Sequence, residues 1–200
     1  YEPHGSGCIL CGHPVAFDKQ CPSCRHLGTI HYDNLSFIHY YTGFFRDVLL
    51  KWKAGGYFRL SYIFSELLIK NGLVNPGTPV VIVPCSTADS FVRAGANLSS
   101  ISSILSGNGI PQIKGVYKKR FSPYFKQKKL TVRQRIDGIG NRFYLPSRNQ
   151  NRYSGRVILL DDVYTTGATV NIGAKLLKEA GFSHVTVITL FRGILDSHHQ

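Results

Sequence analysis

Residues 157–169 read Val-Ile-Leu-Leu-Asp-Asp-Val-Tyr-Thr-Thr-Gly-Ala-Thr, and this stretch decides the fold. Its first four residues are all apolar, which predicts a strand buried on both faces of a parallel sheet. The strand delivers Asp161 and Asp162 to its carboxyl end, where open α/β sheets bind ligands. A short turn then leads directly into an amphipathic helix, predicted over residues 169–180.

The turn after the two acids has the composition of a phosphate cradle. Backbone N–H groups at the start of a helix lack partners within the helix and carry partial positive charge. Thr165, Thr166 and Thr169 add hydroxyl donors. Gly167 permits a positive φ and a close approach of the backbone, and the absence of Lys excludes a Walker-type loop. The alternative is a strand that ends in solvated acids before a helix with a Thr cap.

The rest of the chain alternates between strand-like and helix-like patterns. Strands are expected at residues 35–41, 80–83, 110–117, 156–160 and 184–190. Helices are expected at residues 44–53, 58–70, 88–106 and 169–180. Strands that alternate with helices imply crossover connections and a parallel sheet. We therefore predict an α/β domain over residues 31–200.

Four cysteines lie in two C-x-x-C pairs near the start of the chain: Cys8, Cys11, Cys21 and Cys24. This spacing predicts a tetrahedral Zn²⁺ site, and four protein ligands leave no open position, so the zinc would be structural. Two disulfides, or a cluster without metal, are the alternatives. The residues predict a small zinc knuckle, and we place its boundary at residues 1–30.

The composition favours anionic partners. Lys and Arg number 24 against 11 Asp and Glu, a formal charge of +13, which suits nucleic acid, phosphorylated metabolites or an acidic membrane surface. No apolar run reaches the roughly 18 residues that span a bilayer. No secretion signal is visible at the first residues, and we expect a cytoplasmic protein without membrane insertion.

The segment from Asp161 to Thr169 resembles the 5-phosphoribosyl-1-pyrophosphate (PRPP) signature of type I phosphoribosyltransferases. The resemblance implies a type I phosphoribosyltransferase-like parallel sheet flanked by helices. It also implies that Asp161 and Asp162 hold the ribose hydroxyls, directly or near Mg²⁺. Residues 165–169 would grip the 5′-phosphate. The implied PRPP-binding set is Asp161, Asp162, Val163, Tyr164, Thr165, Thr166, Gly167, Ala168 and Thr169.

Further segments are similar to the ComF family, whose members join a four-cysteine zinc module to this transferase fold. The matching segments are Lys51-Trp52-Lys53-Ala54-Gly55, Val83-Pro84, Ala94-Gly95-Ala96-Asn97, the series Gln127, Leu130, Arg135 and Phe143, and Thr189-Leu-Phe-Arg192. The chain departs from the family at Ala94 and Ala96, where an Arg and a Phe are usual. Arg93, one residue earlier, is either a replacement for the missing Arg through a shift of register or a solvated residue. The loss falls where pyrophosphate needs cationic donors, so binding is better supported than catalysis.

The ComF resemblance implies further site residues and partners. The pyrophosphate side would include Lys51, Pro84, Cys85, Arg93 and Asn97, and a mobile hood would include Gln127 and Arg135. Cys85 also reads as a small buried residue. The implied role is in natural competence, in the handling of incoming single-stranded DNA, with helicase-type competence proteins as further partners.

Three functions remain open from the sequence. One is PRPP binding within the competence system, with or without phosphoribosyl transfer. The second is base salvage, which is weakened because the hypoxanthine/guanine enzymes place an Asp where Thr165 stands. The third is a PRPP sensor or a single-stranded DNA-binding module. The basic, aromatic stretch at residues 114–135 could be the hood, a DNA contact or a solvated loop.

Overall fold

The computed structural model describes the central domain and the four cysteines. The described residues are 8, 10–14, 21, 24, 27–54, 57–83, 98–113 and 154–194, together with the backbone of 117–118 and 143–144. In the part of the chain so described, no helix combines the length and the apolar character needed to cross a membrane.

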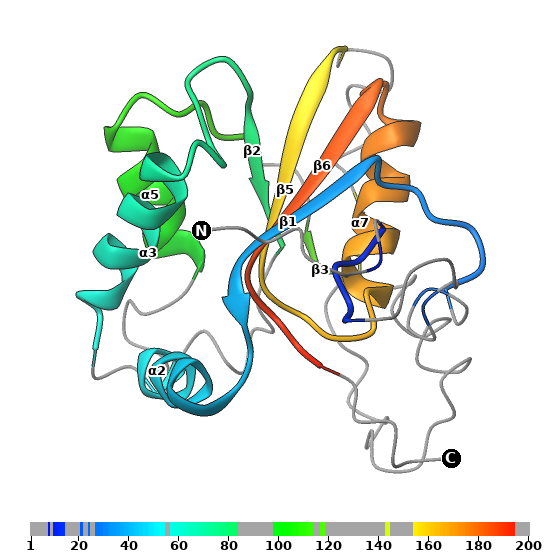
Figure 1. The fold of residues 1–200 in the computed structure, drawn as a ribbon. Coiled ribbons are helices and arrows are strands. Elements are labelled where there is room, and N and C mark those ends of the chain that lie inside the picture. Colours follow the sequence, from blue (N-terminus) through cyan, green and yellow to red (C-terminus); the bar gives the residue numbers. More distant parts are fainter. Residues whose placement is uncertain are drawn as a thin grey trace.

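A four-stranded sheet forms the centre of the domain, and all of its strands run parallel (Figure 1). Its order is β1 (Asn34–Tyr40), β6 (His184–Arg192), β5 (Arg156–Tyr164) and β2 (Val80–Ile82). The predicted α/β fold with a parallel sheet is confirmed.

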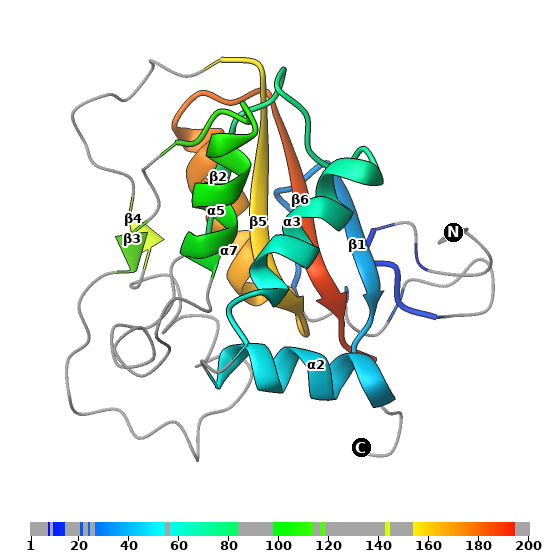
Figure 2. The same ribbon diagram turned by 90° about the vertical axis from the view of Figure 1, so that its left-hand side faces the viewer.

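Helices cover both faces of this sheet. Figures 1 and 2 show α7 (Ala168–Glu179) on one face and α3 (Leu60–Lys70) with α5 (Leu98–Gly107) on the other. Helix α2 (Gly43–Lys53) runs across the carboxyl ends of the strands (Figure 2). It therefore lies at the edge where parallel α/β sheets bind their ligands.

The apolar run of β5 contributes side chains to the hydrophobic clusters on both faces of the sheet. Val157 and Leu159 pack into the cluster beneath α7, whereas Ile158 and Leu160 pack into the cluster beneath α3 and α5, as the alternation of a strand requires. We call these the α7-side cluster and the α3-side cluster. The α7-side cluster also contains Cys11, Cys21, Cys24, Tyr32, Tyr164, Val170, Ala174 and Leu177. The α3-side cluster also contains Leu49, Trp52, Phe64, Leu68, Ile101, Leu105, Ile188 and Phe191.

Several boundaries differ from those that the sequence predicts. Strand β5 continues to Tyr164 instead of ending at residue 160, because β6 runs beside it as far as Arg192. Both acids therefore lie inside the strand. The strand expected at 110–117 is divided: Gln112 forms a single bridge with Val80, and β3 (Tyr117–Lys118) pairs with β4 (Phe143–Tyr144) in a separate antiparallel ribbon. Of the helix expected at 88–106, the described part is α5.

Candidate functional site

The turn between β5 and α7 borders a small open hollow at the surface of the protein. Strand β5 and helix α7 are separated only by residues 165–167, so the first amides of a 12-residue helix face the end of the strand. These amides can receive an anion because they have no partners within the helix. The hollow is lined by Asp161, Val163, Tyr164, Thr165, Thr166, Gly167, Thr169 and Val170.

Gly167 gives the turn its shape. Its φ of 79° lies in the left-handed region, where a side chain is unfavourable, and it occupies the N-cap position of α7. A Cβ atom at this position would overlap the phenol of Tyr164. The side chains of Thr165 and Thr166 are exposed, and Thr166 Oγ1 lies 3.5 Å from the amide nitrogen of Ala168. The two exposed hydroxyls can therefore contact a bound group.

The two adjacent acids point toward different surroundings. Asp161 lines the hollow, and its Oδ1 accepts a hydrogen bond of 2.8 Å from the amide of Asp162. The carboxylate of Asp162 instead forms an ion pair of 2.6 Å with Lys53 Nζ of α2. Successive side chains of a strand project to opposite faces. A ligand that contacts both acids must therefore lie across the carboxyl end of β5.

Lys53 is a residue of this region that the sequence did not single out. Its side chain is 24% exposed and reaches Asp162, whereas the side chain of Lys51, the expected cation, is exposed. The intervening Trp52 is fully buried, and each helical residue is rotated by about 100° from the last. The two lysines therefore leave α2 in different directions. Only the position of β5 relative to α2 decides which lysine meets an acid.

Arg192 is a second residue whose role the sequence did not reveal. It lies at the end of β6, is fully buried, and stacks its guanidinium over the ring of Tyr164 at 4.7 Å from the centroid. Its Nη1 donates to the carbonyl oxygens of Tyr164 at 3.4 Å, Thr165 at 3.3 Å and Gly193. The family motif that ends at Arg192 could have signalled it. The buried charge thus contacts the backbone where the turn begins.

The hydroxyl end of the Tyr164 side chain contacts a second tyrosine, Tyr32. Its hydroxyl lies 3.0 Å from that of Tyr32, and the two rings meet edge to face. Burial raises the pKa of both phenols, so both stay neutral and one donates to the other. Because Tyr32 lies two residues before β1, this contact joins the segment that leads into β1 to the end of β5.

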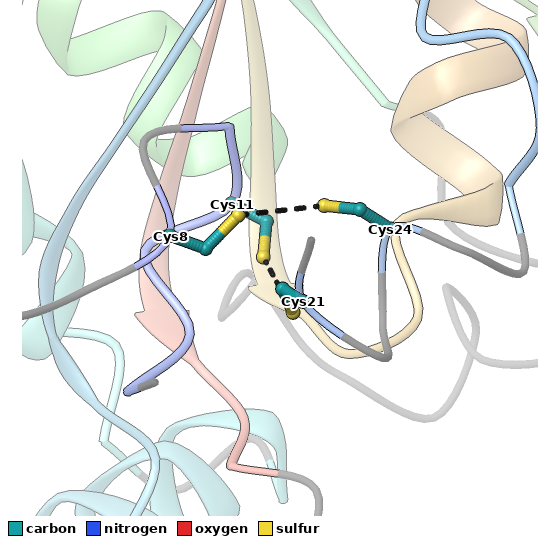
Figure 3. A group of neighbouring side chains, drawn as sticks. All are labelled: Cys8, Cys11, Cys21 and Cys24. Atoms are coloured by element: carbon teal, nitrogen blue, oxygen red, sulfur yellow. Dashed lines mark hydrogen bonds between the residues drawn. The ribbon is translucent and has the colours of Figure 1, made fainter. Parts of the chain in front are cut away.

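The four cysteines come together as the sequence predicts (Figure 3). All four sulfur atoms lie within 4.8 Å of one another, with Cys8 and Cys24 3.8 Å apart and Cys11 and Cys21 3.4 Å apart. Tetrahedral binding with metal–sulfur bonds of about 2.3 Å separates ligand sulfurs by about 3.8 Å. All four thiols are free, which contradicts the disulfide alternative. The group is therefore positioned to bind a metal ion.

Burial opposes ionisation of two of these thiols. It raises the pKa of Cys11 to about 11 and places that of Cys24 still higher. Burial also acts on Cys8, but hydrogen bonds to its sulfur from the backbone of Leu10 and Cys11 outweigh it and lower the pKa. Metal ligands must be thiolates, so a bound cation would supply the charge that holds Cys11 and Cys24 deprotonated.

The segment between Cys24 and β1 is hydrogen-bonded to α7. The side chain of Asn171 donates to the carbonyl oxygen of Thr29 and accepts from the amide of His31, both at 2.8 Å. Asn171 is buried, and these bonds satisfy both ends of its amide. The segment that joins the cysteines to β1 is thereby attached to the helix that follows the turn.

Several predicted site residues lie outside the described residues. They are Pro84, Cys85, Arg93 and Asn97 on the expected pyrophosphate side, the departures Ala94 and Ala96, and the expected hood residues Gln127 and Arg135. Their roles stay predictions.

Fold and site together define an α/β protein that carries a Thr-Gly turn, an acid at the same hollow, and a four-thiol group able to bind metal. No protein-family model matches the chain. It is 24% identical over 147 residues to Competence protein ComFC of Streptococcus pneumoniae, a match that covers 74% of this chain and 63% of that protein. It is 37% identical over 84 residues to Competence protein F of Haemophilus influenzae, covering 42% of this chain and 36% of that protein.

These two relatives confirm the resemblance to the ComF family, and the cysteine group agrees with it. The matches span less than two thirds of the length of either relative.

Proposed function

We propose that this chain binds PRPP at the hollow between β5 and α7 and acts in natural competence. The observation that carries the proposal is the shared hollow: Asp161 and the Thr165–Gly167 turn line one space at the start of a helix. A ligand that joins a phosphate to a sugar diol needs these two kinds of partner side by side. The left-handed Gly167 supports it, because a positive φ lets the backbone turn sharply between the strand and the first amides of α7.

In this proposal each part of the ligand has its own residues. The 5′-phosphate is held by the amides and hydroxyls of residues 165–169, and the ribose hydroxyls face Asp161 and Asp162. Mg²⁺ bound with PRPP would neutralise part of the pyrophosphate charge. Lys53 supplies a positive charge beside Asp162. Transfer of the phosphoribosyl group to an acceptor is a further step, in which pyrophosphate would leave the anomeric carbon.

We propose structural Zn²⁺ as the metal of the four cysteines. Four thiolates suit this ion and leave no coordination position for a substrate. The ligands would be Cys8, Cys11, Cys21 and Cys24, whose sulfurs are already close to tetrahedral spacing.

We further propose a cytoplasmic role with single-stranded DNA and helicase-type competence proteins as partners. The names of the relatives support the competence role, and the charge of +13 suits nucleic acid. Nucleic acid binds cationic proteins by releasing counterions, so DNA affinity should fall steeply with salt. A flat salt response would contradict this part of the proposal.

Isothermal titration with PRPP and Mg²⁺ tests the proposed site on the zinc-loaded full chain. The double variant Asp161→Asn with Asp162→Asn should lose the binding signal, because it removes both acceptors for the ribose hydroxyls. Glu66→Gln is the matched control, since this exposed acid pairs only with Lys70 on the surface of α3 among the described contacts. Undiminished affinity in the double variant would refute the placement.

Pyrophosphate release in the presence of PRPP and a panel of free bases tests transfer separately. Release with one base would assign an acceptor. Binding without release from any base would leave a PRPP-binding protein that is not a transferase.

A further inference from the structure

Arg192 connects the two candidate sites of the molecule. One side of its guanidinium faces the cysteines: Nε donates to the carbonyl oxygen of Cys11 at 2.7 Å, and Nη2 lies 3.6 Å from Cys11 Sγ. The other side, through Nη1, contacts the carbonyls of Tyr164 and Thr165. A single buried side chain therefore contacts both a cysteine of the four-thiol group and the turn.

The contact with the turn determines which way its peptide groups face. In a trans peptide the N–H points roughly opposite to the C=O. When Arg192 holds the carbonyls of Tyr164 and Thr165, the amides of Thr165 and Thr166 must point away from the guanidinium. Thr165 and Thr166 line the hollow. Arg192 thus keeps their backbone donors from turning inward, and this preorganises the turn for an anion.

The contact with Cys11 depends on the charge of its sulfur. A neutral thiol is a weak acceptor, whereas a thiolate in a four-thiolate site with a divalent ion carries part of a net charge of about −2. A charge-assisted N–H bond to such a sulfur is stronger than a neutral one, and contacts of this kind orient metal ligands. Arg192 is therefore held most firmly when the cysteines are thiolates bound to metal.

We infer that Arg192 couples the four-cysteine site to the Thr165–Gly167 turn, so that metal binding and ligand binding strengthen each other. Arg192 acts as a positioning residue, because it contacts the turn from its buried side. The inference rests on the proposed function only in naming PRPP as the ligand of the turn. Coupling between two sites is reciprocal, so each ligand must change the affinity of the other by the same factor.

Hydrogen–deuterium exchange on the full chain tests the link without PRPP. Removal of the metal with a chelator should raise the exchange of the Gly193 amide, which donates to the Tyr164 carbonyl at the start of the turn, while the buried amides of β6 at 185–190 stay protected. With metal bound, Arg192→Lys should already show the faster exchange at Gly193, because lysine keeps the charge but cannot contact both sides. Unchanged protection of the Gly193 amide after metal removal would overturn the inference.

Asn171→Ala is the matched control. It removes the hydrogen bonds to Thr29 and His31, and in the described structure neither residue belongs to the turn. The Gly193 amide should still respond to metal in this variant. If it responds no longer, the seating of the cysteine segment as a whole, and not Arg192, carries the coupling. Metal removal could also speed exchange of the β6 amides at 185–190. In that case the coupling is tested by comparing exchange of the Gly193 amide in metal-loaded wild type and in metal-loaded Arg192→Lys.

The reciprocal arm measures metal release to a chelator with and without PRPP. Coupling between sites commonly corresponds to about 5–150-fold in affinity, so saturating PRPP should reduce the metal released at equilibrium and raise the metal affinity of the wild type by at least about fivefold. Arg192→Lys should lose most of this effect. If PRPP binds the wild type but leaves release unchanged, the coupling is refuted. If PRPP does not bind at all, the proposed function falls, and the exchange experiment alone decides the coupling.

Discussion

On the α3 side of the central sheet, buried contacts join apolar and aromatic side chains, whereas on the α7 side the same sheet buries a polar network. Trp52, Phe64 and Phe191 meet edge to face on the first side. There, the hydrogen bond of Trp52 reaches Ser61, nine residues away. On the second side, Tyr32 meets Tyr164 and Arg192 meets Cys11 across separations of 132 and 181 residues. The contrast suggests that the α3 side supplies stability and the α7 side supplies a defined geometry for the turn.

The largest effect is expected from the apolar side. Phe64→Ala should lower the free energy of unfolding by about 3–5 kcal/mol, because it removes a buried ring that contacts both Trp52 and Phe191. Denaturant titration measures this loss. The loss should be the same with and without metal, since Phe64 belongs to the cluster away from the cysteines. A loss that depended on metal would contradict the separation of the two faces.

Gly167→Ala should have the next largest effect. The left-handed backbone costs a residue with a side chain about 1–2 kcal/mol, and the new methyl group would also displace the phenol of Tyr164. We expect a lower midpoint of thermal unfolding and weaker PRPP binding. Gly107→Ala is the control, because a Cβ there meets no atom within 4 Å. Wild-type PRPP affinity in Gly167→Ala would show that the turn does not bind the ligand.

The tyrosine pair tests whether the polar contacts on the α7 side act as a unit. Tyr32→Phe and Tyr164→Phe should each lower the free energy of unfolding by about 1–3 kcal/mol, because each leaves a buried hydroxyl without its partner. The double variant should lose less than the sum, since no orphaned hydroxyl remains. Tyr62→Phe, at an exposed position, should have little effect. Additive losses would show that the two hydroxyls do not interact.

The smallest effect is expected at Asp33, where β1, β6 and α7 meet. Its Oδ2 accepts from the amide of Val185 and from Lys178, each at 2.7 Å. Burial would raise the pKa of Asp33, but these hydrogen bonds outweigh it and hold the pKa below its usual value. The carboxylate therefore stabilises the fold above its unfolded pKa, and this contribution disappears as the pH falls through the lower folded pKa.

Unfolding measured across the acid range checks this sign. The free energy of unfolding of Asp33→Asn should fall less on acidification than that of the wild type. Lys178→Met should also reduce this fall, because it removes one partner of the carboxylate. A steeper decline in Asp33→Asn would contradict the assignment.

Much of the fold could be predicted because its signals are local. The apolar run at Val157–Leu160 gave the central strand, and the spacing of the four cysteines gave a group able to bind metal. The directions of Asp161 and Asp162 could not be predicted, because the extension of β5 to Tyr164 depends on how far β6 pairs with it. The same reason applies to Lys53, whose partner is fixed by the position of α2 at the carboxyl ends of the strands.

The amino-acid sequence was enough to predict the alternation of the four sheet strands with helices, the acids followed by a Thr-Gly turn, and the grouping of the cysteines, because each is a pattern within a few consecutive residues. Three contacts became known from the folded structure alone: Lys53 meets Asp162, Tyr32 meets Tyr164, and Arg192 lies between Cys11 and the turn. These contacts join residues far apart in the chain, and no local periodicity encodes them. They exist because the parallel sheet brings the end of β6, the end of β5 and the cysteine segment to the same edge.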